Sequence, residues 1–188
     1  EAVTPDSLFD VASLTKPLAG VPCGLLMLER SENEGDISNL LRHTSTLNDE
    51  TDFPKLENVR SKLSEIDNKN LQYRYANANY LLLTNMFVER LPNPITQLNN
   101  RIWEPMGINQ ATWLPDANVV WSGTNKNGET IVGRPFDPVA DRLLAEGYPL
   151  VLHSGLFASA KDVALFGESA LKDYKKLGHY LFGPTTEL

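Results

Sequence analysis

The stretch from about Ala78 to Leu91 constrains the fold most, because its pattern is helical and it is apolar on most faces. A helix of this kind is stable only when other parts of the protein cover it. Pro92 and Pro94 follow at once, and proline cannot continue a helix. We therefore predict a buried helix that ends near Leu91.

Helical patterns also dominate the rest of the chain. We expect a helix from Ser13 to about Arg30, with Pro17 in its first turn and a kink or break at Pro22. Residues 31–36 are predicted to form a polar loop, and Leu40 and Leu41 to begin a short element that ends near Thr46. Strand signals are few and short.

Four further elements follow from spacing and turn residues. Apolar spacing predicts amphipathic helices over 56–66 and 95–106, the second closed by Gly107. Asn127-Gly128 is typical of a hairpin turn between residues 119–121 and 130–132. A last helix begins at Ser159, where Asp162 completes a capping-box pattern, and is predicted to end at Gly178.

Composition narrows the classes of partner. The 188 residues suit one domain, and 41% hydrophobic with 22% charged residues is ordinary for a soluble globular protein. A net charge of −7 without a basic run argues against a nucleic-acid partner. No apolar stretch is long enough for a membrane span. Cys23 is the only cysteine, which excludes an internal disulfide, and its apolar neighbours favour a small buried hydrophobe over a reactive thiol.

Ser13 and Lys16 form a workable acylation device. A serine hydroxyl is a poor nucleophile until another group takes its proton. A lysine three residues later on a helix lies one turn away on the same face, and a buried lysine can act as a base. The start of a helix also favours the negative charge that develops on the serine oxygen.

The Ser-x-x-Lys spacing is common by chance, and a second copy, Ser169 to Lys172, provides an internal control. That copy lies late in a charged helix, so we interpret it as a solvated face. The first copy differs because it lies at a helix start among apolar residues. The chain also contains a Tyr-x-Asn pattern at Tyr75-Ala76-Asn77, whose tyrosine can relay protons and whose amide can hold a lysine or a substrate carbonyl.

Four blocks of the chain together resemble the class C β-lactamase-like superfamily, which includes penicillin-binding proteins, D-amino-acid peptidases and esterases. The first block resembles the segment around that superfamily's nucleophile, and the second its Leu-Leu-x-His-Thr-Ser-Gly-Leu segment, with Thr46 where glycine is usual. The third resembles its Tyr-Ser/Ala-Asn segment and the fourth its His-Ala-Gly-Leu-Phe-Ser-Thr-Ala segment. The blocks occur in the superfamily's order, at residues 9–18, 40–47, 73–80 and 153–164.

The resemblance implies an α+β, β-lactamase/transpeptidase-like fold and an acyl-enzyme mechanism. Ser13 would attack a carbonyl carbon, Lys16 and Tyr75 would move protons, and Asn77 would position the substrate. No cofactor is implied. The implied partner is a small-molecule or peptidoglycan-like acyl substrate, and a periplasmic or extracellular location is favoured.

The chain departs from the superfamily in its third motif, a Lys/His-Thr/Ser-Gly strand that also supplies an oxyanion-hole N–H. The only pattern match is His153-Ser154-Gly155, which leads into a helix and matches a different segment. His153 is therefore either a substrate-binding residue in place of the third motif or a structural residue of its loop. His43 is expected to be packed and hydrogen-bonded rather than a catalytic base.

We expect residues 1–188 to form a single β-lactamase-like domain that is mainly the helical subdomain and lacks most of the sheet. The leading hypothesis is a serine hydrolase acting on an ester, amide or lactam. Absence of Lys-Thr-Gly argues against an efficient β-lactamase, whereas esterase and penicillin-binding activities both fit. The alternative is an inactive homologue that serves as a binding or regulatory module. A metal-dependent hydrolase is disfavoured, because the three histidines and one cysteine show no ligand spacing.

Overall fold

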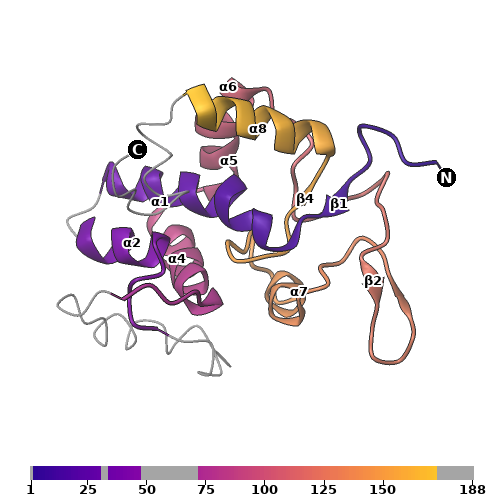
Figure 1. Ribbon diagram of the computed structural model, residues 1–188, viewed down its shortest axis with the longest axis horizontal. Helices are drawn as coiled ribbons and strands as arrows, with labels where there is room; N and C mark the ends of the chain where they lie inside the picture. The colour runs from indigo at the N-terminus through magenta and orange to yellow at the C-terminus, as the bar shows by residue number, and fades with distance from the viewer. Residues whose placement is uncertain (1, 31–33, 48–71, 173–188) are drawn as a thin grey trace.

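The computed structural model describes residues 2–30, 34–47 and 72–172, and helices form most of this part of the chain. Helices α1 (Val21–Leu28), α2 (Glu34–Leu41) and α4 (Asn77–Arg90) gather at one end of the molecule, and the β2–β3 hairpin lies at the other (Figure 1). The three helices contact one another. The predicted helix over 56–66 lies outside the described residues.

The predicted helix from Ser13 is present but changes its winding twice. A 3₁₀ turn, Ala12–Leu14, leads into a π-helix, Lys16–Gly20, and then into α1. Pro22, in the first turn of α1, has no N–H to donate to the carbonyl of Leu18 one turn earlier. The indole Nε1 of Trp103 donates to that oxygen instead, at 2.8 Å. The break predicted at Pro22 thus takes the form of a change from π- to α-helix with the freed carbonyl satisfied.

One local prediction is wrong. Residues 31–36 were expected to form a loop before an element starting at Leu40, but α2 begins at Glu34 and ends at Leu41. Asp36 lies in the first turn, where a carboxylate interacts favourably with the helix dipole. Ile37, Leu40 and Leu41 are all buried, so the apolar stripe belongs to the last turns of one helix.

Helix α4 is buried over most of its length, as predicted, and begins one residue earlier than expected. The segment from Lys16 to Leu28 packs against it at very short range. A Cβ on Gly20 would lie 2.5 Å from the Tyr80 ring, and one on Gly24 would lie 2.6 Å from the Leu41 side chain. Glycine at these two positions therefore allows the segment that follows Ser13 to approach α2 and α4.

The predicted helix over 95–106 is also present, in three pieces. It consists of α5 (Pro94–Leu98), a π-helical turn (Asn99–Trp103) and α6 (Glu104–Met106). Gly107 follows with a φ of 78°, the left-handed conformation that commonly ends a helix. The rings of Trp103 and Trp113 stack with centroids 5.7 Å apart, which ties this helical stretch to the chain beyond it.

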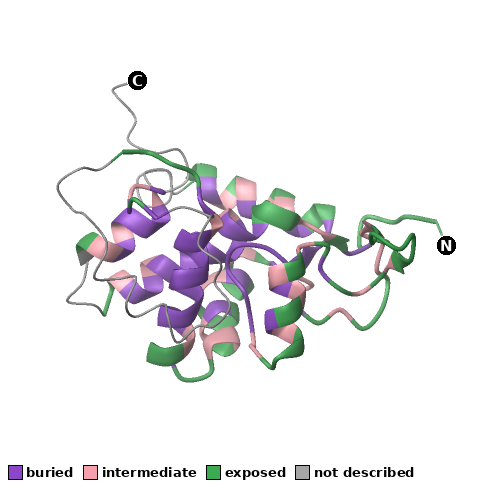
Figure 2. Ribbon diagram, turned by 90° about the horizontal axis from the view of Figure 1, so that it is seen from below, coloured by how far each residue is buried: buried purple, intermediate pink, exposed green. Residues whose placement is uncertain are grey.

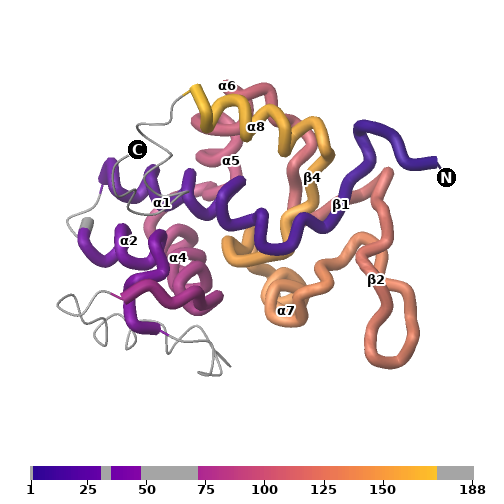
Figure 3. Tube along the Cα trace, viewed as in Figure 1, coloured from indigo at the N-terminus to yellow at the C-terminus, as the bar shows by residue number. Residues whose placement is uncertain are grey.

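Two short antiparallel pairs make up the sheet content of the described residues. The first joins β1 (Phe9–Asp10) to β4 (Phe157–Ala158), so that distant parts of the chain lie side by side (Figure 3). The second is the predicted hairpin, β2 (Gly123–Thr124) with β3 (Thr130–Ile131) around Asn127-Gly128. These few, short strands beside many helices agree with the predicted fold class.

Two helices complete the described structure. Helix α7 (Pro138–Ala145) was not predicted, and helix α8 (Ala160–Lys172) starts where expected. Ser159 and Asp162 form the predicted capping box, with Asp162 N donating to Ser159 Oγ at 3.1 Å and Ser159 N donating to Asp162 Oδ2 at 3.2 Å. The predicted end at Gly178 lies outside the described residues.

The buried side chains gather where α1, α2 and α4 meet, and exposed residues dominate the hairpin end (Figure 2). The loop before β4 is also fully buried and continues the core toward β1. The largest buried side chains include Ile37, Leu82, Phe87, Leu98, Leu152 and Phe157. The segment that carries Ser13 thus leaves a paired strand, β1, and enters the best-packed part of the molecule.

Candidate active site

Ser13 lies in the 3₁₀ turn directly after β1. Ala12 has a φ of 46°, an uncommon value for a residue with a side chain. Two hydrogen bonds hold it there: its N–H donates to Asp10 Oδ1 at 2.9 Å, and its carbonyl accepts from Thr15 Oγ1 at 2.6 Å. Ser13 follows this turn residue and is exposed, whereas Lys16, three residues later, is buried.

The ammonium group of Lys16 has an acceptor for each of its three N–H bonds. Its Nζ donates to Ser13 Oγ at 3.1 Å, to Asn77 Oδ1 at 2.8 Å and to the carbonyl of His153 at 2.8 Å. Lys16 is only 5% exposed, so little water can reach its ammonium group. The three acceptors supply the hydrogen bonds that water would otherwise make. An ammonium held in this way favours negative charge on neighbouring oxygens.

Tyr75 also contacts Ser13, from a segment distant in sequence. Its hydroxyl donates to Ser13 Oγ at 3.0 Å, and its ring centroid is 4.9 Å from Lys16 Nζ. Tyr75 as a whole is 49% exposed. The Ser13 oxygen therefore has two groups within proton-transfer distance.

A second tyrosine, Tyr80, lies 5.7 Å from Lys16 Nζ but is differently placed. Burial raises the pKa of Tyr80, and the charges of Tyr75 and Tyr73 raise it further. Its hydroxyl donates to the carbonyl of Leu41 at 3.0 Å. Tyr80 thus stays protonated and bonded to Leu41, and Tyr75 is the tyrosine whose hydroxyl contacts Ser13.

Asn77 is the first residue of α4 and is half-buried. Its Oδ1 accepts from Lys16, which turns the amide nitrogen away from the ammonium. The start of α4 therefore brings both residues of the Tyr-x-Asn pattern to the Ser13–Lys16 pair. The four residues come from two segments that are 61 and 62 positions apart at their contacts.

His153 contributes to this group through its backbone and not its side chain. Its imidazole is 1% exposed, and Nε2 lies 3.0 Å from Asp137 Oδ1, whereas its carbonyl oxygen accepts from Lys16. The adjoining residues run beside the segment that carries Ser13, with Val11 N donating to the carbonyl of Leu156 at 3.0 Å. The structure thus places the imidazole in the protein interior.

Asp137 is the N-cap of α7, and its Oδ1 also accepts from Val139 N and Ala140 N at 3.0 and 2.8 Å. Burial raises the pKa of the Asp137 carboxyl, but the hydrogen bond and charge of His153 and the two backbone N–H groups lower it more. The net pKa lies below its usual value. Sequence analysis missed this residue, although Asp137-Pro138 is a helix-start signal.

Other predicted residues have the expected surroundings. In the control copy, Lys172 Nζ donates to Glu168 Oε1 at 2.7 Å, and both side chains are exposed. Cys23 is fully buried, and burial raises the pKa of its thiol well above the usual value. His43 is buried and hydrogen-bonded, and its ring lies against Tyr75, a proximity that sequence analysis did not predict.

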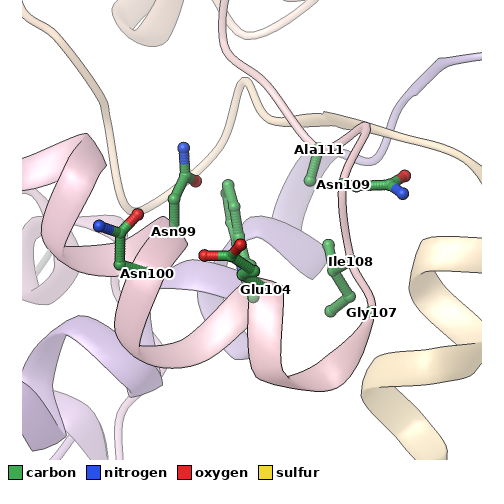
Figure 4. A pocket seen from close by; sticks show the side chains of 8 residues that line it. Asn99, Asn100, Glu104, Gly107, Ile108, Asn109 and Ala111 are labelled. Carbon is green, nitrogen blue, oxygen red and sulfur yellow. The ribbon is translucent and has the colours of Figure 1, made fainter.

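A separate pocket of about 460 Å³ lies where the helix ending at Gly107 meets the following segment (Figure 4). Polar side chains, among them Asn99, Asn100, Glu104 and Asn109, border it. None of the predicted site residues lines this pocket. Among the described residues, no group of three His, Cys, Asp or Glu side chains is placed to hold a metal ion. Within that same part of the chain, no helix is both long and apolar enough to cross a membrane.

Comparisons with known proteins give matches at the level of structure. No protein-family model matches the sequence, and no curated protein sequence matches it. A class C β-lactamase from Rhodobacter sphaeroides superposes with a TM-score of 0.65 at 14% identity, covering 98% of this chain and 58% of that one. FmtA from Staphylococcus aureus gives 0.59 at 17% identity, covering 93% and 53%. The octameric penicillin-binding protein homologue from Pyrococcus abyssi gives 0.57 at 16% identity, covering 93% and 47%.

The chain spans about half the length of these solved structures. The matches cover nearly all of the present chain, and its helices and few strands are those of one part of the larger fold. The chain therefore has the β-lactamase/penicillin-binding-protein-like fold, of which it represents mainly the helical subdomain.

Proposed function

We propose that the chain carries the nucleophile of a serine acyl-transfer enzyme, with Ser13, Lys16, Tyr75 and Asn77 in the site. The observation that carries the proposal is the position of Ser13 Oγ, which is 3.1 Å from Lys16 Nζ and 3.0 Å from the Tyr75 hydroxyl. A nucleophile with groups that can exchange a proton with it at hydrogen-bond distance is the arrangement that acylation needs.

In the proposed reaction, one member of the Lys16–Tyr75 pair is deprotonated, and it takes the proton of Ser13 Oγ as that oxygen attacks the carbonyl carbon of the substrate. The carbonyl π electrons move to its oxygen, which forms a tetrahedral intermediate. When that intermediate collapses, the bond to the leaving group breaks and the pair returns the proton to the departing atom. Water then hydrolyses the Ser13 ester with the same groups acting in reverse.

The substrate is an ester, amide or lactam, and a peptidoglycan-like acyl donor is included in this class. Asn77 is proposed to bind the substrate, because Lys16 fixes its oxygen and leaves its amide N–H groups as donors. His153 takes part through its carbonyl, which orients Lys16, and a direct contact between its side chain and substrate would require the loop to move.

Intact mass after incubation with a penicillin or an activated ester tests the proposal. We expect an adduct of the acyl mass on the full-length protein and no adduct on Ser13→Ala. Ser169→Ala, which alters the control copy of the motif, should acylate as the parent protein does. Absence of an adduct from every acyl donor, in folded full-length protein, would contradict the proposal.

A second candidate is an inactive homologue that binds ligands or partners without turnover. It is favoured by the short sheet content of the described residues and by the absence of a Lys-Thr-Gly motif from the sequence. The same experiment separates the two, because a binding module would retain the acyl donor without covalent attachment.

A further inference from the structure

His43 lies between the end of α2 and the Tyr75 segment, and it holds the backbone on both sides of Tyr75. Its carbonyl accepts from Arg74 N at 2.8 Å, and its Nδ1 accepts from Ala76 N at 3.2 Å. The residues immediately before and after Tyr75 are therefore attached to one residue. His43 itself has a φ of 56° and is 8% exposed, so its main chain and ring are both fixed by their surroundings.

The imidazole of His43 also contacts the Tyr75 ring directly. The two ring centroids are 4.5 Å apart with an interplanar angle of 31°, and the Tyr80 ring is 5.1 Å from His43. The Tyr75 side chain therefore has few positions available, because the backbone on both sides of it is hydrogen-bonded to His43 and its ring packs against the imidazole. The Tyr75 hydroxyl is thereby kept at its distance from Ser13 Oγ.

The hydrogen bonds define the protonation of His43. Because a backbone N–H can only donate, Nδ1 must accept and carries no proton. The amide of Asn79, whose Nδ2 lies 3.3 Å from Nδ1, donates to the same atom. Ser45 Oγ donates to Asn79 Oδ1, which fixes the orientation of that amide. The imidazole beside Tyr75 is thus a hydrogen-bond acceptor at Nδ1.

We propose that His43 is a positioning residue for Tyr75 and acts through the acceptor atom Nδ1 and the packed ring. The inference rests on the proposed function, because it assigns Tyr75 to proton transfer at Ser13. Displacement of a catalytic group by about 1 Å can reduce a rate about 100-fold. Loss of His43 should therefore slow acylation without removing any group that touches the substrate.

Three substitutions of His43 distinguish the effect of its hydrogen-bond acceptor from the effect of its packing. Asparagine places an amide oxygen near the position of Nδ1 and tolerates a positive φ, whereas glutamine places its oxygen farther along the side chain. We expect His43→Ala and His43→Gln to lower the maximum acylation rate by about 100-fold. His43→Asn should recover about tenfold of this loss, a gain that matches one hydrogen bond. The ester concentration for half-maximal rate should change little.

A second measurement follows the backbone without depending on turnover. Amide hydrogen exchange at Ala76 should speed up by about tenfold in His43→Ala and His43→Gln, and return toward the parent rate in His43→Asn. Ser159→Ala is the control, because it removes a buried capping hydroxyl that makes no contact with the site. It should lower stability while leaving Ala76 exchange and acylation close to those of the parent.

The outcomes distinguish the two proposals. If the parent protein acylates and the His43→Ala, His43→Gln and His43→Asn variants acylate at equal rates, the positioning role is overturned and the proposed function stays intact. If His43→Ala does not fold, the comparison of Asn with Gln decides in the same way. A parent protein that no donor acylates would overturn the proposed function and, with it, the assignment of Tyr75, whatever the exchange at Ala76 shows.

Discussion

At the scale of single residues, two tyrosines near Lys16 differ in their exposure and in their hydrogen-bond partners. Tyr75 and Tyr80 both lie near Lys16, but the first is half exposed and donates to Ser13, whereas the second is buried and donates to Leu41. The hydroxyl of Tyr75 thus bonds a side chain of the proposed site, and that of Tyr80 bonds a backbone carbonyl of the core. Removing each hydroxyl separately should produce opposite results.

Tyr75→Phe should lower the acylation rate by about 10²- to 10⁴-fold, the usual contribution of a positioned proton-transfer group. Its midpoint of urea unfolding should stay close to that of the parent, because the lost hydroxyl is exposed. Tyr80→Phe should instead cost about 1 kcal/mol of stability, since the Leu41 carbonyl loses its donor, and should keep most of the acylation. The measurements are the acylation rate and the urea unfolding of both variants. The reverse ranking of the two rates would contradict the assignment of Tyr75.

Sequence reasoning predicted the contact between Ser13 and Lys16, because a spacing of three on a helix is a local property. The approach of Tyr75 and Asn77 was suggested by the chemistry of the Tyr-x-Asn pattern and by the resemblance, and by no local spacing, since their contacts join positions about 60 residues apart. The pairing of His153 with Asp137 was missed because no local pattern relates a loop carbonyl, a buried imidazole and a helix cap. A side chain's exposure and direction depend on the packing of the whole molecule.

At the scale of elements, the sequence predicted helices well where turn residues or apolar stripes mark them. Helices α4 and α8 begin within a residue of their predicted starts, and Gly107 ends α6. The start of α2 was misplaced because its first turn is polar and carries no apolar signal. The π-helix over Lys16–Gly20 was not predicted either, since it depends on the contact between Leu18 and Trp103, which is distant in sequence.

The packing of the Lys16–Leu28 segment on α4 predicts different effects of alanine at two helical glycines. At Gly20 a methyl group would meet the Tyr80 ring at 2.5 Å and the Leu152 carbonyl at 3.2 Å. Gly20→Ala should therefore destabilise the protein by about 1–3 kcal/mol, the usual cost of overpacking. Gly167 in α8 has open space around it, so Gly167→Ala should stabilise by about 0.5–1 kcal/mol. Urea unfolding of both variants makes the comparison, and a stabilised Gly20→Ala would contradict the close approach.

At the scale of the whole molecule, Asp137 links three regions that meet near the site. It caps α7, binds the imidazole of His153, and so fixes the loop whose carbonyl orients Lys16. That loop continues into β4, which pairs with β1 just before Ser13. The ionised carboxylate is therefore expected to support both the stability of the fold and the geometry of the Ser13 site.

This link predicts an acid dependence whose sign follows from the pKa of Asp137. Burial raises that pKa, but His153 and the backbone N–H groups of α7 lower it more, so it lies below the ordinary value of 3.8. A carboxyl whose pKa is lowered by folding stabilises the protein fully above its unfolded pKa, and this contribution disappears as pH falls through the folded value. Asp137→Asn should cost about 1.5–3 kcal/mol near neutral pH, since hydrogen bonds to a charged group are lost.

Urea unfolding of the parent protein and Asp137→Asn at a series of pH values tests this dependence. The difference between the two should be constant down to about pH 4 and should shrink at lower pH, where the parent carboxyl takes up a proton. Asp141→Asn is the matched control, because that carboxylate also lies in α7 and pairs with the exposed Arg134, which precedes the helix. It should change stability by at most about 1 kcal/mol. A difference for Asp137→Asn that stays constant through the acid range would show that the charge of Asp137 does not hold α7 and the His153 loop together.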